Sequence, residues 1–574
     1  MARQHIQFDN TVLGNSRFAT PQELHNAGLL SNTGGVVFGR INNHLVEKPP
    51  ELQGHCLIVG GTGTGKSRGI AIPTLLRWKG AVFAIDVKGE LSDITAGHRQ
   101  GKVYIFNPEG YGASYDPLQE CKTVDGANEL ARSLIPEPQN GDPFWAKTAQ
   151  AFLAAGALEG ALTGSRFVDV IEKLCTTQPE QLIEGFQSSP HRSVRLLSSV
   201  GVGMPEKTLG GVFAELRSRI LSLGADPNIE RATSHSAWTP QCLEEGSTVY
   251  LKVSERMIKQ YEGLWTVIVS QVLRYLSGRP ERSEPPILIL LDEFARLGKL
   301  PGILEALSTL RSRNVHIALF IQSMAQLDHI YSPAERKIIA DNCGYKLVLS
   351  ATDPETQKYF SDLSGQRTVW VGNQASGSGR NTSGGISLIP GASSHDSRGL
   401  TQQGTPLIRP EEFARLPYPV LFAPNLNPCY VSKSYWDQDP DIAPIAGLNP
   451  VKPVKLYGRD PRPKRRRLGT LSLLLISLLP GFVLGVFLAQ AILRYSLGSE
   501  TLLKSVLGGT YSRSEVEALR RAASDFGFMV KTIFSGGGSF VEFLRIWIYG
   551  SIPFFLALLL ARSIFRKIAG RSRT

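Results

Sequence analysis

The sequence contains few cysteines and no spacing that would bring them together. Its six cysteines are scattered over 574 residues, and no two of them form a CxxC pair. The ten histidines do not cluster at the spacing of metal ligands either. These absences argue against a zinc site and against a disulfide-stabilised scaffold, and they are typical of a protein in a reducing compartment.

A basic surplus is missing from most of the chain. The net charge is +12, but residues 451–574 hold 20 Lys and Arg against 6 Asp and Glu. The first 450 residues hold 42 basic and 44 acidic residues, a balance of −2. The surplus therefore lies around apolar segments near the C-terminus, and net charge alone is weak evidence for nucleic-acid binding.

Two long uncharged runs lie in that C-terminal region. The first, residues 468–493, exceeds the roughly 20 residues that a helix needs to cross a bilayer. The second, residues 546–561, is shorter, but Trp547 and Tyr549 suit the membrane interface and arginines flank the run. We expect two transmembrane helices, with a buried core helix as the alternative.

Flanking charge predicts the orientation of these two helices. Basic residues precede the first run and follow the second, whereas the 494–545 segment between them mixes signs and contains five acidic residues. Under the positive-inside rule, both outer ends face the cytoplasm and the loop lies outside. The N-terminal sequence lacks an apolar h-region, so no signal peptide is predicted. We therefore expect the membrane anchor to be C-terminal.

The fold class predicted for the rest of the chain is α/β. Short apolar runs alternate with longer helical patterns, which is typical of a mainly parallel sheet. Strand signals vanish between about residues 124 and 239, where helices are expected at 144–162, 167–174 and 208–223. We infer an all-α domain inserted into the sheet domain. The candidate strands are residues 56–59, 81–85, 103–106, 248–253, 287–291, 315–321 and 345–349.

Composition divides the chain further. Residues 372–404 are crowded with Gly, Ser, Asn and Gln, and we expect a mobile loop or linker there. The Pro-rich stretch before the first uncharged run is expected to be a spacer. The expected parts are an N-terminal entry segment (1–50), the first part of the nucleotide-binding domain (51–123), the all-α insertion (124–240), the second part (241–440), a basic linker (441–467), the first transmembrane helix (468–493), an extracytoplasmic loop (494–545), the second transmembrane helix (546–561) and a basic cytoplasmic tail (562–574).

A glycine-rich motif carries the clearest chemistry. It follows the apolar run of residues 56–59 and precedes a helical pattern, which is the strand–loop–helix order of a phosphate-binding loop. The glycines let the backbone wrap the phosphates of a nucleotide such as ATP. Lys66 reaches the β and γ oxygens, and Ser67 can bind Mg²⁺. The motif consists of Gly60, Gly61, Thr62, Gly63, Thr64, Gly65, Lys66 and Ser67.

Further catalytic candidates follow two other strands. Asp292 and Glu293 come directly after five apolar residues, where Asp292 would hold Mg²⁺ and Glu293 would polarise the attacking water. Gln322 follows the 315–321 strand and can sense the γ-phosphate, or it can simply cap the turn. Arg311 and Arg313 precede that strand, and either could act on a neighbouring subunit as an arginine finger or remain a solvated charge.

The order of these motifs closely resembles the TraG/TraD-like coupling proteins of type IV secretion systems, over roughly residues 15–435. The chain departs from familiar members, whose membrane anchor precedes the motor domain. The matching stretches are residues 60–67, Ile72-Pro73-Thr74-Leu75-Leu76, Asp86-Val87-Lys88-Gly89-Glu90-Leu91, Thr95-Ala96-Gly97, Phe106-Asn107-Pro108, Asp142-Pro143-Phe144-Trp145, Leu291-Asp292-Glu293-Phe294-Ala295, Gln322-Ser323-Met324-Ala325-Gln326-Leu327 and 407–417.

The resemblance implies a RecA-like P-loop ATPase, with ATP and Mg²⁺ as cofactors, that assembles as a homohexamer. Together with the two expected transmembrane helices, it predicts a multi-pass protein of the bacterial inner membrane, with its ATPase domain in the cytoplasm. The implied partners are single-stranded DNA bound to a relaxase and the subunits of a type IV secretion channel. By the same resemblance, Asp86, Lys88 and Glu90 are further candidates near the site.

Three functions remain open at this point. The first is an ATPase that drives DNA into the channel during conjugation. The second is a coupling ATPase that delivers effector proteins without pumping DNA, with the all-α domain as the receptor. The third is a membrane receptor that uses nucleotide only to assemble. A chromosome-segregation translocase fits the motifs less well.

Overall fold

The computed structural model describes residues 13–110, 112–138, 141–379 and 393–447. The described residues belong to one compact unit. The predicted membrane helices, the 494–545 loop and the basic tail lie outside the described residues. Within the described ranges, no helix combines the length and apolarity that a bilayer crossing requires.

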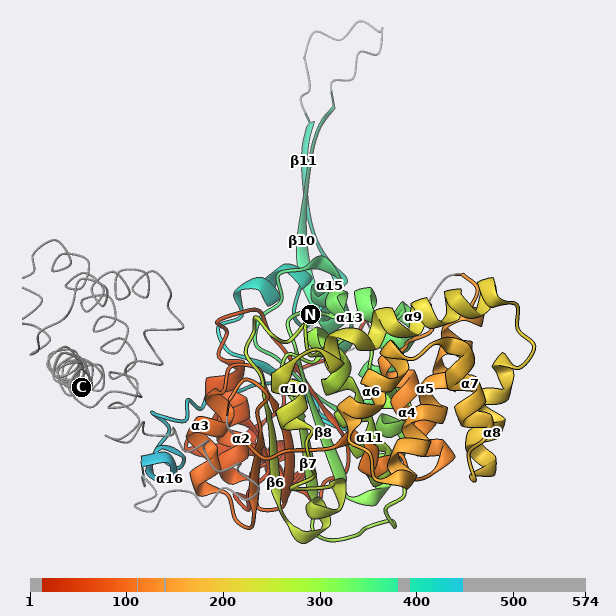
Figure 1. Ribbon diagram of the computed structural model, residues 1–574. Coiled ribbons are helices and arrows are strands. Elements are labelled where there is room, and N and C mark those ends of the chain that lie inside the picture. The colour runs from red at the N-terminus through yellow and green to blue at the C-terminus, as the bar shows by residue number, and fades with distance from the viewer. Residues whose placement is uncertain (1–12, 111, 139–140, 380–392, 448–574) are drawn as a thin grey trace, which may run out of the picture. The chain divides into compact units, whose positions relative to one another are not determined.

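A nine-stranded sheet forms the centre of this unit (Figure 1). Its strand order is β13-β12-β9-β3-β8-β7-β4-β6-β5, and the seven strands from β9 to β5 run parallel. Only β12 and β13, at one edge, are antiparallel additions. The strands are β3 (Cys56–Val59), β4 (Ala81–Asp86), β5 (Val103–Phe106), β6 (Thr248–Lys252), β7 (Ile287–Leu291), β8 (Val315–Ile321), β9 (Tyr345–Val348), β12 (Val420–Phe422) and β13 (Cys429–Tyr430).

Both faces of the sheet are buried, because alternate residues along each strand enter two different cores. Leu57, Phe83 and Ile289 belong to one cluster, whereas Ile58 and Val82 belong to the other. A parallel sheet covered on both faces explains why its strands are continuous apolar runs. The helices that follow the sheet strands are α2 (Ile72–Arg77), α3 (Glu90–Thr95), α11 (Glu262–Ser277), α12 (Ile303–Thr309), α13 (Met324–Ile330), α14 (Pro333–Asn342) and α15 (Pro354–Ser364).

The segment between β5 and β6 is helical, as the sequence predicted. Its helices gather beside the sheet (Figure 1), and α4 packs against α11 of the sheet domain. The apolar core of the larger cluster continues from the sheet into these helices. They are α4 (Val124–Leu134), α5 (Phe144–Thr163), α6 (Phe167–Thr176), α7 (Pro179–Gln187), α8 (Arg192–Ser198), α9 (Glu206–Gly224) and α10 (Pro227–Ala232).

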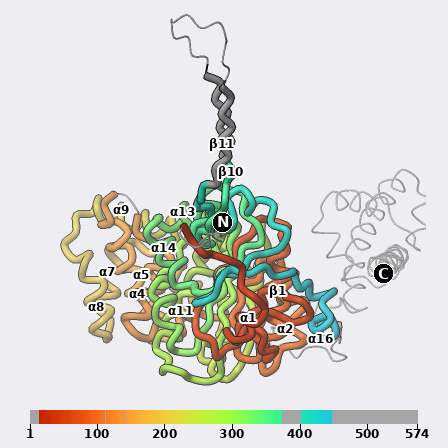
Figure 2. The backbone as a smooth tube through the Cα atoms, turned by 180° about the vertical axis from the view of Figure 1, so that it is seen from behind, coloured from red at the N-terminus to blue at the C-terminus, as the bar shows by residue number. Residues whose placement is uncertain are grey.

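An N-terminal strand and the last described residues of the chain lie beside each other (Figure 2). A small antiparallel hairpin, β1 (Val36–Ile41) with β2 (His44–Lys48), follows the short helix α1 (Pro21–Asn26). Arg40 of β1 pairs with Asp439 at 2.7 Å and with Asp441 at 2.6 Å, just before α16 (Ala443–Gly447). These ion pairs attach the last described residues to the N-terminal hairpin.

The expectation of a loop at residues 372–404 was wrong for the described part of that segment. β10 (Gln366–Gly379) and β11 (Ser393–Pro406) form a long antiparallel hairpin that leaves the body of the unit (Figure 1). Backbone pairing runs from Gln366 opposite Pro406 to Gly379 opposite Ser393. Because ladder hydrogen bonds use main-chain groups, a Gly- and Ser-rich composition weakens a strand without preventing its pairing.

Candidate nucleotide-binding site

The predicted phosphate-binding loop lies between β3 and the π-helical turn η1 (Ser67–Ala71). The N–H of Gly60 donates to the carbonyl of Ile321 at the end of β8, at 3.1 Å. Gly63 and Gly65 have φ angles of +76° and +94°, which glycine adopts without steric cost. These conformations let a glycine-rich loop wrap an anion closely, so the loop fits the phosphates of a nucleotide.

Lys66 places a buried cation inside this loop. Its side-chain ammonium donates to the carbonyl of Gly60 at 2.6 Å and to that of Gly61 at 3.3 Å, and the residue is 6% exposed. Burial lowers the pKa of Lys66, while the charges of Glu293 and Asp292 act in the opposite direction. The ammonium therefore lies within electrostatic reach of both carboxylates, as the predicted site requires.

Glu293 and Gln322 meet at the carboxyl edge of the sheet. β7 and β8 are neighbours, so the residues that follow them lie side by side. The Gln322 Nε2 donates to the Glu293 Oε2 at 2.9 Å. Glu293 has φ +52° and ψ +42°, a left-handed conformation that costs energy for a residue with a side chain. The hydrogen bond fixes the carboxylate that would polarise the attacking water.

Removal of the Gln322 amide should slow catalysis without weakening nucleotide binding. A hydrogen bond to a charged group contributes about 1.5–3 kcal/mol, so we expect Gln322→Ala to lower kcat for ATP about tenfold or more. The KM should change little, and steady-state ATPase kinetics measure both. Gln260→Ala, which removes an exposed amide bonded to Asp226, is the matched control. A raised KM with an unchanged kcat would contradict this assignment.

The carboxyl group of Asp292 is buried, and its pKa is raised above the ordinary value for an aspartate. Burial, followed by the charge of Glu293, raises its pKa to about 7, although Lys66 opposes this shift. An unfolded aspartate has a pKa near 3.8, so the folded state holds the extra proton between about pH 4 and pH 7. Stability therefore falls as the pH rises through this window. A bound Mg²⁺ would supply the charge that a deprotonated Asp292 needs.

This titration predicts how Asp292→Asn changes stability with pH. In the absence of Mg²⁺ and nucleotide, the variant should gain stability over the wild type at about pH 8, where the wild-type carboxylate is charged and buried. The gain should be much smaller at about pH 5, where the carboxyl is protonated. Denaturant unfolding at the two pH values measures the difference. An equal gain at both values would rule out a titrating Asp292.

The Asp86-Lys88-Glu90 candidates divide into a structural residue and two residues at the surface. The Asp86 carboxylate is buried and accepts hydrogen bonds from the N–H groups of Gly89, Leu91 and Ser92 at 2.7–3.3 Å. It therefore stabilises the start of α3. The Lys88 side chain is 48% exposed, and its charge helps to lower the pKa of Lys66. Glu90 is exposed at the start of α3.

The structure does not bring Arg311 and Arg313 to the loop. Both precede β8 and lie at its amino end, whereas the phosphate-binding loop lies beyond the carboxyl end of the adjacent parallel β3. The guanidinium of Arg313 donates to the carbonyl of Arg279, while Arg311 is exposed. An arginine finger that acts on another subunit stays a prediction, and Arg311 is the better candidate of the two.

Three residues beside the loop were missed by sequence reasoning. Arg68 follows the motif directly, and its guanidinium lies 4.7 Å from the centre of the Tyr435 ring. The Arg68 Nε donates to Asp437 Oδ1 at 2.9 Å. Tyr435 and Asp437 are more than 360 positions away in the sequence and belong to no recognisable motif, so only the fold places them here.

A phosphate-binding loop, a buried lysine and an acidic pair at the carboxyl edge of a doubly covered parallel sheet define a P-loop NTPase with RecA-like architecture. The sequence profile described as "Type IV secretory system Conjugative DNA transfer" matches residues 17–454. The chain belongs to this family. The resemblance that its motifs indicated is thereby confirmed.

Individual relatives agree with this assignment. VirD4 of Rhizobium radiobacter is 30% identical over 430 residues, which cover 70% of this chain and 60% of the relative. A conjugal transfer protein TraG of Escherichia coli is 26% identical over 473 residues, which cover 71% of each chain. The matched part spans about 60% of the length of the curated VirD4 proteins.

Solved structures show the same fold. The plasmid coupling protein TrwB, in complex with the non-hydrolysable ATP analogue ADPNP, aligns with a TM-score of 0.59 and 19% identity, covering 79% of this chain and 98% of that one. TrwB in complex with ADP and Mg²⁺ aligns with a TM-score of 0.56 and 21% identity. The RecA-like NTPase fold with an all-α part, predicted from the sequence, is confirmed.

Proposed function

We propose that this chain is a coupling ATPase that recruits relaxase-bound single-stranded DNA and drives it into a type IV secretion channel during conjugation. The observation that carries the proposal is the Gln322–Glu293 hydrogen bond, since it brings together residues from two strand ends beside Asp292, within electrostatic reach of Lys66. Family membership supports the DNA cargo and the channel as partners.

Each residue of the site has a role in this proposal. The loop amides and the Lys66 ammonium bind the phosphates, and Ser67 with Asp292 would hold Mg²⁺, which supplies charge to the β and γ oxygens. Glu293 orients and polarises a water molecule by accepting its hydrogen bond. Gln322 fixes the Glu293 carboxylate through its hydrogen bond. As a sensor, it can change this contact when the γ-phosphate is bound or released. ATP with Mg²⁺ fits this donor set, and the similar protein TrwB binds the ATP analogue ADPNP in one complex and ADP with Mg²⁺ in another.

We further propose the assembly and the location that the sequence predicted. Residues 468–493 and 546–561 would anchor the protein in the bacterial inner membrane, with the ATPase domain in the cytoplasm. Six copies would form a ring, and the divisions at residues 123 and 240 would separate the two parts of the motor domain from the all-α domain. The charge pattern supports the membrane location, and the run of helices between β5 and β6 supports the two divisions.

Plasmid transfer between cells tests the proposal against a purely structural use of nucleotide. Transfer should be lost with Lys66→Ala and with Glu293→Gln, because translocation needs hydrolysis as well as binding. A receptor that uses nucleotide only to assemble would keep transfer in Glu293→Gln and lose it in Lys66→Ala. That outcome would overturn the proposed motor function.

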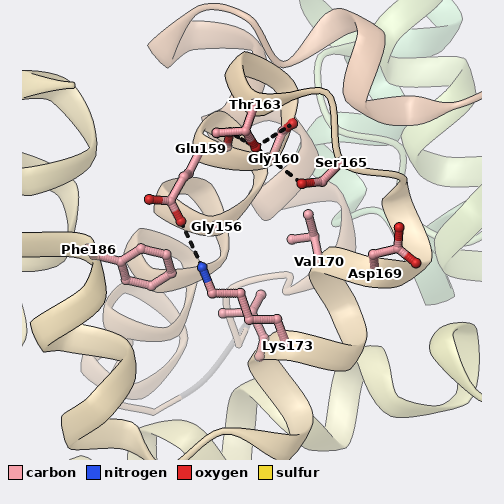
Figure 3. Close-up of a pocket in the computed structure, with 10 residues that line it drawn as sticks. Gly156, Glu159, Gly160, Thr163, Ser165, Asp169, Val170, Lys173 and Phe186 are labelled. Carbon is pink, nitrogen blue, oxygen red and sulfur yellow. Dashed lines mark hydrogen bonds and ion pairs between the residues drawn. The ribbon is translucent and has the colours of Figure 1, made fainter. Parts of the chain in front are cut away.

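A cavity in the all-α part supports protein delivery as a second candidate function. It measures about 420 Å³ and is lined mainly by residues of α5 and α6 (Figure 3). Lys173 pairs with Glu159 at 2.9 Å and lies 5.4 Å from the centre of the Phe186 ring. Charged and apolar groups together suit a short peptide segment.

A charge reversal at this cavity separates the two functions. If the cavity receives a protein signal, Lys173→Glu should abolish effector delivery and leave the ATPase rate unchanged. Lys207→Glu, an exposed position on α9, is the matched control. Unchanged delivery in Lys173→Glu would exclude the cavity as the receptor.

A further inference from the structure

The segment after β13 crosses the first turn behind the phosphate-binding loop. We call residues 432–442 the C-terminal strap. The N–H of Trp436 donates to the carbonyl of Arg68 at 3.1 Å, and the Asp437 carboxylate binds the Arg68 guanidinium. At its far end, Ile442 is fully buried in a small cluster with Val37 of β1. The strap is therefore held at both ends.

The strap places the aromatic ring of Tyr435 in contact with the phosphate-binding loop. A Cβ atom on Gly65 would lie 3.1 Å from the Tyr435 Cε1, and one on Gly69 would lie 3.6 Å from the same atom. The ring therefore packs on the loop backbone itself, at positions where glycine leaves room for it. Tyr435 is half-buried, and its ring also faces the guanidinium of Arg68 at 4.7 Å.

The Arg68 guanidinium is held over this ring by a carboxylate. Asp437 binds it through two nitrogens, Nε at 2.9 Å and Nη2 at 2.5 Å, which fixes the plane of the group. The Arg68 side chain is still 47% exposed. A planar, preorganised surface that is partly open to solvent thus lies immediately after the residues that would bind the phosphates.

The direction of a bound nucleotide follows from the loop. Lys66 faces Glu293 and Asp292, so the γ-phosphate end points toward the acidic pair. Ser67 and Arg68 begin the helical turn η1 that follows the loop. The sugar and base, at the other end of the nucleotide from the γ-phosphate, then extend from the loop toward Arg68. The stacked pair lies on that side. Arginine guanidinium planes and aromatic rings are the groups on which nucleobases stack.

We propose that Arg68 and Tyr435 form the platform on which the base of the bound nucleoside triphosphate stacks. The inference rests on the proposed nucleotide site and adds the residues that recognise the base. Because stacking uses the π-face that every base has, the platform binds purine nucleotides with little preference for adenine over guanine.

Binding of ATP and of inorganic tripolyphosphate, each with Mg²⁺, tests the platform by calorimetry on the full chain. Tripolyphosphate has the phosphates but no base. Arg68→Ala and Tyr435→Ala should each weaken ATP binding about tenfold and leave tripolyphosphate binding unchanged. Tyr435→Phe, which keeps the ring, should bind ATP like the wild type. Tyr418→Ala, at an exposed tyrosine, is the control for a general effect.

The possible outcomes separate the platform from the nucleotide site itself. If Lys66→Ala abolishes ATP binding while Arg68→Ala and Tyr435→Ala bind ATP normally, the nucleotide site stands and the platform is wrong. If the two platform variants lose tripolyphosphate binding as well, the pair only supports the loop, and the platform is again wrong. Equal wild-type affinity for the two ligands also overturns it. Absence of any ATP binding by the wild type contradicts the proposed function.

An independent readout is covalent labelling. Light-activated 8-azido-ATP carries its reactive group on the base, so it should label the strap in the wild type and lose that labelling in Tyr435→Ala. Labelling confined to segments that contain neither Arg68 nor residues 432–442 would contradict the placement of the base.

Discussion

Replacement of Glu293 by glutamine is expected to lower the rate of ATP hydrolysis by about 10²–10⁴-fold, because a positioned general base contributes that much to a rate. ATP binding should stay nearly unchanged. Glutamine keeps the size of the side chain and can still bond to Gln322, but it cannot polarise water as a carboxylate does. Hydrolysis assays with saturating ATP, together with calorimetric titration of ATP, measure the two effects separately.

The matched control for Glu293→Gln is Glu255→Gln. Glu255 is a half-exposed carboxylate near the site that pairs with Lys88 at 3.6 Å and with Arg296 at 3.5 Å. Its amide variant should hydrolyse ATP within about twofold of the wild type, as exposed ion pairs contribute little. Equal rates for Glu293→Gln and the wild type would assign the role of the base to another residue.

Lys66→Ala is expected to weaken ATP binding strongly and to lower kcat by about 10²–10³-fold, the loss that follows removal of one preorganised charge-stabilising donor. The ammonium is held by the carbonyls of Gly60 and Gly61 and faces two carboxylates. In its absence, those carboxylates would repel the phosphates without compensation. Nucleotide titration and single-turnover hydrolysis check both effects.

Lys88→Ala is the matched control for this variant. Lys88 is half-exposed, and its charge is near enough to lower the pKa of Lys66. Its removal should change ATP affinity by a few-fold at most, because an exposed charge is screened by solvent and salt. If the two alanine variants lost ATP binding to the same extent, a general loss of positive charge would explain the effect of Lys66→Ala.

The central sheet was highly predictable because its strands are short, apolar on both faces and bounded by polar turns. β3, β5, β7 and β8 have the predicted bounds, and the polar residues after β7 and β8 meet at the predicted edge. Such strands are continuous apolar runs, and a run of this kind can be recognised from neighbouring residues in the sequence alone. The helical insertion was equally visible, because strand signals vanish between residues 124 and 239 and helical patterns replace them.

Other features depend on contacts between distant parts of the chain and could not be predicted. Tyr435 reaches the phosphate-binding loop only because the chain adds β12 and β13 to the sheet next to β9, and β9 is the neighbour of β3. The β10–β11 hairpin has a composition typical of a linker, yet its main chain forms a continuous ladder. Asp86 was a candidate near the site by resemblance, and the sequence did not predict that it accepts hydrogen bonds from the start of α3.

The rate of ATP hydrolysis with and without single-stranded DNA tests the central claim most directly. The full chain, shown to be oligomeric, should hydrolyse ATP faster when DNA is added, and the stimulation should vanish in Glu293→Gln. Hydrolysis that depends on Glu293 but does not respond to DNA would contradict DNA pumping and favour delivery of proteins. Absence of ATP hydrolysis by the wild type under both conditions would contradict the motor itself.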